Sequence, residues 1–227
     1  MYPTSIMNEE VEKLLKDLNK YNHHFIKITK NLVKDSQEMY QVDFYVIGIV
    51  NRSLSLLYGF ETLIKSNNFN AAIHLVRLHL DSLLRLSAVW LVDDSESFVK
   101  EVMAGKPVAK LKDRKNKLLS DSYLAEQASG IFPWIRDVYK TTCGFIHYSN
   151  KHIYRGIRID KVGRIISGKI SKEDINIQDT SRKEAIECMI ETSRCIILFI
   201  EKWLNFKKEL KHSVRIRIRN NREDNFH

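Results

Sequence analysis

The residues best suited to chemistry lie in one short stretch, residues 141–153, with the sequence TTCGFIHYSNKHI. Four side chains there can transfer protons or form hydrogen bonds: His147, Ser149, Asn150 and His152. Histidine suits general acid–base work because its ordinary pKa, about 6.5, lies near neutral pH. We therefore expect this stretch to belong to a functional site.

Other interpretations of the stretch stay open. His147 can be a structural residue near a helix C-terminus, where the helix dipole favours a protonated imidazole. Cys143 precedes His147 by one helical turn and can act as a nucleophile, although no third group that would orient the pair is evident. His147 and His152 are five residues apart, a poor spacing for two metal ligands on one helical face. We expect neither a metal nor a cofactor.

A second set of polar residues interrupts the apolar segment 69–92, whose apolar character nearly all round predicts a buried central helix. His74, Arg77, Asp81 and Arg85 follow one another at steps of three, four and four residues, which places them on one side of that helix. Buried charge needs partners, and Arg77 and Asp81 are spaced to pair with each other. The stripe is either functional or an ion-pair network that fixes the core.

Apolar periodicity elsewhere predicts an all-α fold, a helical bundle with one small β-hairpin. Further helices are expected over residues 8–32, 37–66, 95–104, 120–129, 132–149 and 181–211. Two β-branched runs flank the turn sequence DKVG and predict a hairpin within residues 153–170. Ser95 is the expected cap of one helix, and Ser181 with Glu184 has the spacing of a capping box for the last.

The chain length of 227 residues suits a single domain, which we place at residues 1–211 with a basic tail at 212–227. The tail alternates arginine with isoleucine and is expected to form an edge strand or a basic arm. The formal net charge of +9 favours a polyanionic partner or an acidic surface. The segment 106–117, KPVAKLKDRKNK, is either a solvated loop or an edge that contacts phosphates.

Several classes of protein are disfavoured by the sequence. The N-terminal residues lack the pattern of a secretory signal, and apolar runs such as CIILFI at 195–200 are far shorter than the roughly 20 residues of a membrane-spanning helix. The three cysteines have no paired spacing, which favours a reducing compartment. We therefore expect a cytoplasmic protein without a membrane partner.

Two segments together, AAIHLVRLHLDSLLRL (71–86) and VYKTTCGFIHYSNKHI (138–153), resemble bacterial helical proteins of the HEPN superfamily. The closer resemblance is to an uncharacterised branch with a degenerate Arg…His motif, and the segment 106–124 also resembles that branch. The resemblance covers roughly residues 40–153. It implies a small all-α bundle that forms a homodimer, and many members are metal-independent ribonucleases of toxin–antitoxin, abortive-infection or CRISPR-linked systems.

The active motif of the superfamily is an arginine, four to six further residues, and a histidine. His147 matches the histidine, whereas Lys140, Thr141 and Thr142 occupy the places allowed for the arginine. Metal-free RNA cleavage requires a base near the 2′-hydroxyl and a cation beside the phosphate. The candidate catalytic residues are therefore His147, Lys140, Arg77, Asp81 and Arg85. The candidate substrate-binding residues are Tyr139, Ser149, Asn150, His152, Lys110, Lys112 and Arg114.

The resemblance implies an endoribonuclease that acts in phage defence or as a toxin, with RNA as substrate and an antitoxin or defence-system protein as partner. The absent motif arginine keeps a second hypothesis open, a catalytically inactive module of the same fold that binds RNA, a nucleotide or a protein. A third is a scaffold subunit whose apolar faces are buried only in an oligomer.

Overall fold

In a computed structural model of the chain, the described residues are 8–34, 39–146, 157–159, 166–168, 174 and 177–223. Only the backbone is described for residues 144–146, 157–159, 166–168 and 211–223. His147, Ser149, Asn150 and His152 lie outside the described residues.

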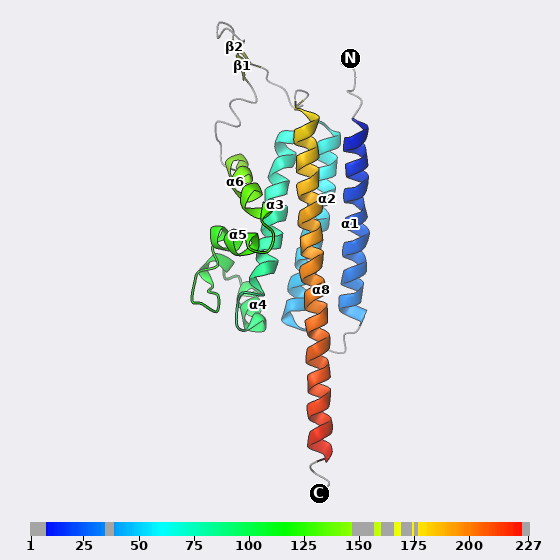
Figure 1. Cartoon of the computed structure of the whole chain (residues 1–227), viewed down its shortest axis with the longest axis vertical. Coiled ribbons are helices and arrows are strands. Elements are labelled where there is room, and N and C mark those ends of the chain that lie inside the picture. The colour runs from blue at the N-terminus through cyan, green and yellow to red at the C-terminus, as the bar shows by residue number, and fades with distance from the viewer. Residues whose placement is uncertain are drawn as a thin grey trace.

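The body of the protein is a bundle of four long helices: α1 (Glu9–Lys34), α2 (Gln41–Lys65), α3 (Phe69–Ala88) and α8 (Asp179–Glu223). Each packs against two neighbours in the order α1, α2, α3, α8 and back to α1. Figure 1 shows α2 running opposite to the other three. The expectation of a mainly helical protein is confirmed.

Shorter helices cover one side of α3. They are α4 (Ser95–Met103), the 3-10 turn η1 (Val108–Lys110), α5 (Asp121–Ser129) and α6 (Trp134–Ile146). Both α5 and α6 pack on α3, which also contacts α2 and α8 (Figure 1). The prediction of a buried central helix is therefore confirmed, although the helix ends at Ala88 and residues 89–93 form turns.

Two three-residue strands, β1 (Ile157–Ile159) and β2 (Ile166–Gly168), pair antiparallel with Arg158 opposite Ser167. They fall within the range predicted for the hairpin. The residues that join them lie outside the described residues, so the complete hairpin stays a prediction.

Three predictions about helix ends are wrong. The cap of α4 is Asp94, whose carboxylate accepts the N–H groups of Glu96 and Ser97 at 3.0 Å, and not Ser95. Because α8 begins at Asp179, Ser181 lies inside its first turn and does not cap it. Residues 212–223 continue α8, so this part of the tail is no edge strand. Extending an existing helix avoids the cost of nucleation, which outweighs the strand-like alternation of the tail.

A buried ion pair fixes the position of α8 along the bundle. Asp43, fully buried in the first turn of α2, accepts a hydrogen bond from Lys207 Nζ at 2.6 Å and one from Trp203 Nε1 at 2.8 Å. The backbone N–H of Tyr40 donates to the same carboxylate at 2.9 Å. Lys207 is only 4% exposed and also approaches the carbonyl of Leu32 at the end of α1. These contacts join α8 to the α1–α2 connection.

Replacing Lys207 with methionine is expected to lower the free energy of unfolding by about 3–5 kcal/mol, because the Asp43 carboxylate stays buried without its cation. Urea unfolding followed by circular dichroism measures the change. The matched control is Lys208→Met, an exposed neighbour whose loss should change stability by no more than about 0.5 kcal/mol. Equal stability of the two variants would contradict the structural role of the pair.

Candidate functional site

Arg77 on α3 and Tyr139 on α6 come together where the two helices pack. The guanidinium carbon of Arg77 lies 4.6 Å from the centre of the Tyr139 ring, a cation–π geometry. Arg77 is only 6% exposed, so its side of this contact is buried where α3 and α6 pack. The structure thus unites two residues that the sequence placed in different parts of the candidate site.

Asp121, the first residue of α5, lies between the two predicted arginines. Its Oδ2 is 3.5 Å from Nη2 of Arg77, and its Oδ1 accepts a hydrogen bond from Arg85. The sequence interpretation missed this residue. An acidic residue in the first turn of a helix is common because it complements the helix dipole, so no local signal distinguished Asp121.

Asp81 also bridges two arginines. It lies 3.1 Å from Arg85 on its own helix and 3.0 Å from Arg52 on α2, which the sequence interpretation did not select. The predicted pairing of Arg77 with Asp81 is wrong, since Arg77 forms its ion pair with Asp121 instead. The packing of α5 on α3 places the carboxylate of Asp121 beside Arg77.

These contacts define an arginine–aspartate chain, made of Arg52, Asp81, Arg85, Asp121 and Arg77 in spatial order. Three arginines against two aspartates leave it one positive charge in excess. Burial opposes the charge on Arg85, but Asp81 and Asp121 outweigh that effect and raise the pKa of its guanidinium above the ordinary value. The arginine–aspartate chain therefore keeps its positive charge at any physiological pH.

Two donors of the arginine–aspartate chain, Nε of Arg77 and Nη1 of Arg85, are buried without an acceptor among the described residues. A buried N–H group without an acceptor costs about 1–3 kcal/mol. An acceptor oxygen at either group would remove that cost there. Unpaired donors beside an excess positive charge favour an anion.

Helix α6 carries two of the predicted site residues, Tyr139 and Lys140. Burial raises the pKa of the Tyr139 phenol, as does Cys143 beside it, whereas Arg77 lowers it in part. The phenol is therefore protonated at neutral pH and can donate a hydrogen bond. Lys140 is exposed on the same helix. The last residue of α6 is Ile146, which directly precedes His147 in the sequence.

The basic segment 106–117 is largely exposed and is held in place by contacts of Asp113. Asp113 is buried and accepts hydrogen bonds from the N–H groups of Lys115 and Lys117 and from the Tyr123 hydroxyl. Lys110 and Lys112 are exposed on this segment, as expected of phosphate-binding residues, and that role stays a prediction.

Arg114 has a structural role in the same segment. Its guanidinium donates to the carbonyls of Trp90, Leu91 and Val92, at distances of 2.7–3.1 Å. These carbonyls follow the C-terminus of α3, where helical partners are lacking. Arg114 therefore holds the chain leaving α3, and a phosphate contact for it stays a prediction.

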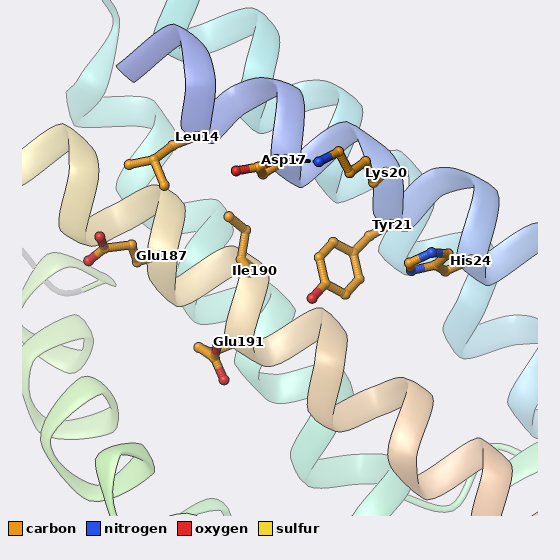
Figure 2. Close-up of a pocket in the computed structure, with 8 residues that line it drawn as sticks. All are labelled: Leu14, Asp17, Lys20, Tyr21, His24, Glu187, Ile190 and Glu191. Carbon is orange, nitrogen blue, oxygen red and sulfur yellow. Dashed lines mark hydrogen bonds and ion pairs between the residues drawn. The ribbon is translucent and has the colours of Figure 1, made fainter. Parts of the chain in front are cut away.

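A groove between α1 and α8, with a volume of about 390 Å³, is the feature drawn in Figure 2. Tyr21 and Ile190 line it, and its charged residues are Asp17, Glu187, Glu191 and Lys20. Lys20 forms an ion pair with Asp17 at 2.6 Å. With three carboxylates against one ammonium group, the groove repels a polyanion and is separate in chemistry from the arginine–aspartate chain.

His79 is a buried titratable residue of α3 that the sequence interpretation did not select. Its Nε2 lies 2.9 Å from the hydroxyl of Ser193 on α8, and its side chain is fully buried. Burial, assisted by the positive charge of Arg52, lowers the pKa of His79 to about 3. The imidazole is therefore neutral at physiological pH and acts as a polar contact between α3 and α8.

The thiols of Cys188, which is half-buried, and Cys195, which is buried, are poor nucleophiles. Burial raises the pKa of Cys188 to about 11 and that of Cys195 to about 12, so both stay protonated at neutral pH. Among the described residues, no group of three or more histidine, cysteine, aspartate or glutamate side chains is arranged to hold a metal ion. In the same part of the chain, no helix combines the length and apolar character needed to cross a membrane.

Comparison with known proteins gives no further assignment: no family model, curated protein or solved structure matches the chain.

The low pKa of His79 predicts a loss of stability in acid. As pH falls below about 6.5, His79 becomes protonated in the unfolded chain, whereas in the folded chain it stays neutral down to about pH 3. Between about pH 7.5 and pH 5 this linkage should remove about 2 kcal/mol from the free energy of unfolding. In His79→Gln, which keeps a donor for Ser193, that part of the pH dependence should disappear.

To test this prediction, urea unfolding at about pH 7.5 and at about pH 5 is compared for the wild type, for His79→Gln and for a control variant. The control is His23→Gln, which removes an exposed histidine from α1. It should retain the wild-type pH dependence. If His79→Gln behaves like His23→Gln, the acid sensitivity arises elsewhere in the chain.

Proposed function

We propose that this chain is a HEPN-like, metal-independent endoribonuclease that acts in phage defence or as a toxin. The observation that carries the proposal is the position of Arg77. It is buried against Tyr139 on α6, whose last described residue, Ile146, precedes His147 in the sequence, and its Nε has no acceptor among the described residues. In the proposal, this cation on α3 replaces the arginine that is absent from the motif.

In the proposed reaction, His147 takes the proton of an RNA 2′-hydroxyl. The resulting oxygen attacks the adjacent phosphorus while the bond to the 5′-oxygen breaks, and the leaving oxygen takes up a proton from solvent. The products are a 2′,3′-cyclic phosphate and a 5′-hydroxyl end. Arg77 stabilises the negative charge that develops on the phosphate, and the Tyr139 hydroxyl orients a phosphate oxygen.

The other predicted residues have supporting roles in this proposal. Asp81 and Asp121 hold the arginines of the chain in place, and Arg85 offers its free Nη1 as a further phosphate donor. Lys140, Ser149, Asn150 and His152 are candidates for contacts with neighbouring nucleotides. The resemblance on which the proposal also rests implies a homodimer and an antitoxin or defence-system partner.

A second candidate function is a catalytically inactive module of the same kind that binds RNA, a nucleotide or a protein. One observation favours it: Asp81 and Asp121 neutralise most of the charge in the arginine–aspartate chain. A network of this kind can serve only to fix the packing of α2, α3 and α5. Binding of RNA without cleavage would then be the measured activity.

The test is cleavage of labelled RNA in the presence of EDTA. Wild type should cut the RNA, and His147→Ala should reduce the rate roughly 10²–10⁴-fold through loss of the general base. Arg77→Lys should reduce it roughly 10²–10³-fold, because the ammonium group cannot supply the geometry of Nε and Nη2. The cleaved ends should carry a cyclic phosphate.

His23→Ala serves as the control, since it removes an exposed histidine of α1 and should leave the rate unchanged. Circular dichroism establishes that each variant is folded. Intact RNA with folded wild type would refute the nuclease and leave the binding module. A normal rate in Arg77→Lys would remove Arg77 from the proposed mechanism.

A further inference from the structure

The C-terminal part of α8 extends beyond the bundle. Figure 1 shows α8 continuing past the ends of α1, α2 and α3. With 45 residues, α8 is about 67 Å long at a rise of about 1.5 Å per residue, whereas the 26 residues of α1 span about 39 Å. The buried Asp43–Lys207 pair marks the level at which α8 leaves the bundle.

This part of α8 is strongly basic. Residues 208–223 contain six lysines and arginines against two glutamates, a net charge of +4, while the whole chain has +9. The preceding residues 179–201 contain five acidic and three basic residues. The charge therefore changes sign along the helix and becomes positive where the helix leaves the bundle.

Five of the basic positions form a stripe along one side of the helix. They are Lys208, Lys211, Arg215, Arg219 and Arg222, which we call the basic stripe. At about 100° per residue these positions fall within an arc of about 80°. Steps of three and four residues separate them by about 4.5–6 Å along the axis, so the basic stripe covers about 21 Å.

The other positions of this segment discriminate between polyanionic partners. A helix that lies on a membrane surface needs a broad apolar face with aromatic or leucine residues. Here the positions opposite the basic stripe are mainly polar: Ser213, Arg217 and Asn220, with Leu210 as an apolar residue among them. A protein interface likewise has an apolar core, which these positions do not offer. Repeated cationic positions with a polar opposite side suit a phosphate backbone.

We propose that the basic stripe binds the phosphate backbone of RNA and thereby holds the substrate beside the bundle. The choice of RNA rests on the proposed function, whereas the polyanion preference rests on charge and helix geometry alone. Recognition of this kind reads phosphates rather than bases, so binding should be independent of RNA sequence and strongly dependent on salt.

The experiment measures binding of 2′-O-methyl RNA by fluorescence anisotropy at several salt concentrations. This RNA lacks the attacking hydroxyl, so binding is observed whether or not the protein cleaves RNA. In the variant Arg215→Gln, Arg219→Gln, Arg222→Gln, three phosphate contacts are lost. The slope of log K against log salt should become shallower by about 2. Glutamine keeps the helix propensity close to that of arginine.

A matched control has the same change in net charge: Lys13→Gln, Lys16→Gln, Lys27→Gln, all exposed on α1. It should retain the wild-type slope. Equal slopes in the two triple variants would overturn the basic stripe as the binding surface. Stripe-dependent binding of duplex DNA or of anionic vesicles, with no stripe-dependent binding of this RNA, would overturn RNA as the partner.

The two proposals fail independently in these measurements. A wild-type chain that binds through the basic stripe but cuts no RNA contradicts the nuclease alone. A chain that cleaves RNA in EDTA, yet shows the same salt slope in the stripe variant as in the control, contradicts the basic stripe alone.

Discussion

The buried contact of Lys207 with Asp43 is the constraint on which the arrangement of the bundle depends. A carboxylate in the first turn of α2 has its charge matched by an ammonium group of α8, with the Trp203 indole and a backbone N–H as further donors. Removing either charge leaves the other buried without compensation, so α8 has one favourable position along its axis. That position determines which residues of α8 lie within the bundle and which extend beyond it.

In the arginine–aspartate chain, the buried donors are paired less completely than the buried carboxylate of Asp43. Asp43 has three partners, whereas Nε of Arg77 and Nη1 of Arg85 have no acceptor in the part of the chain that the structure describes. Unpaired buried groups are costly, and an anion could supply the missing acceptors. These unpaired donors are the physical basis of the proposed phosphate site.

The distribution of charge connects the two proposals. The groove between α1 and α8 is acidic, the arginine–aspartate chain has a single positive charge in excess, and the basic stripe holds repeated cations. In the two proposals, capture of RNA by the basic stripe is separate from the chemistry at Arg77 and His147. The proposals predict that affinity depends on salt through the basic stripe, while the rate depends on the orientation of a few buried groups.

The sequence by itself determined the helices, the buried character of α3 and the polar stripe of Arg77, Asp81 and Arg85, because these follow from the spacing of neighbouring residues. Only the tertiary structure decided the partners: Asp121 for Arg77 and Arg85, Arg52 for Asp81, and Asp43 for Lys207, which is 164 residues away. Tyr139 was predicted as a site residue, but its contact with Arg77 was not. Periodicity fixes which side of a helix carries charge, whereas the choice among distant carboxylates and rings depends on how the helices pack.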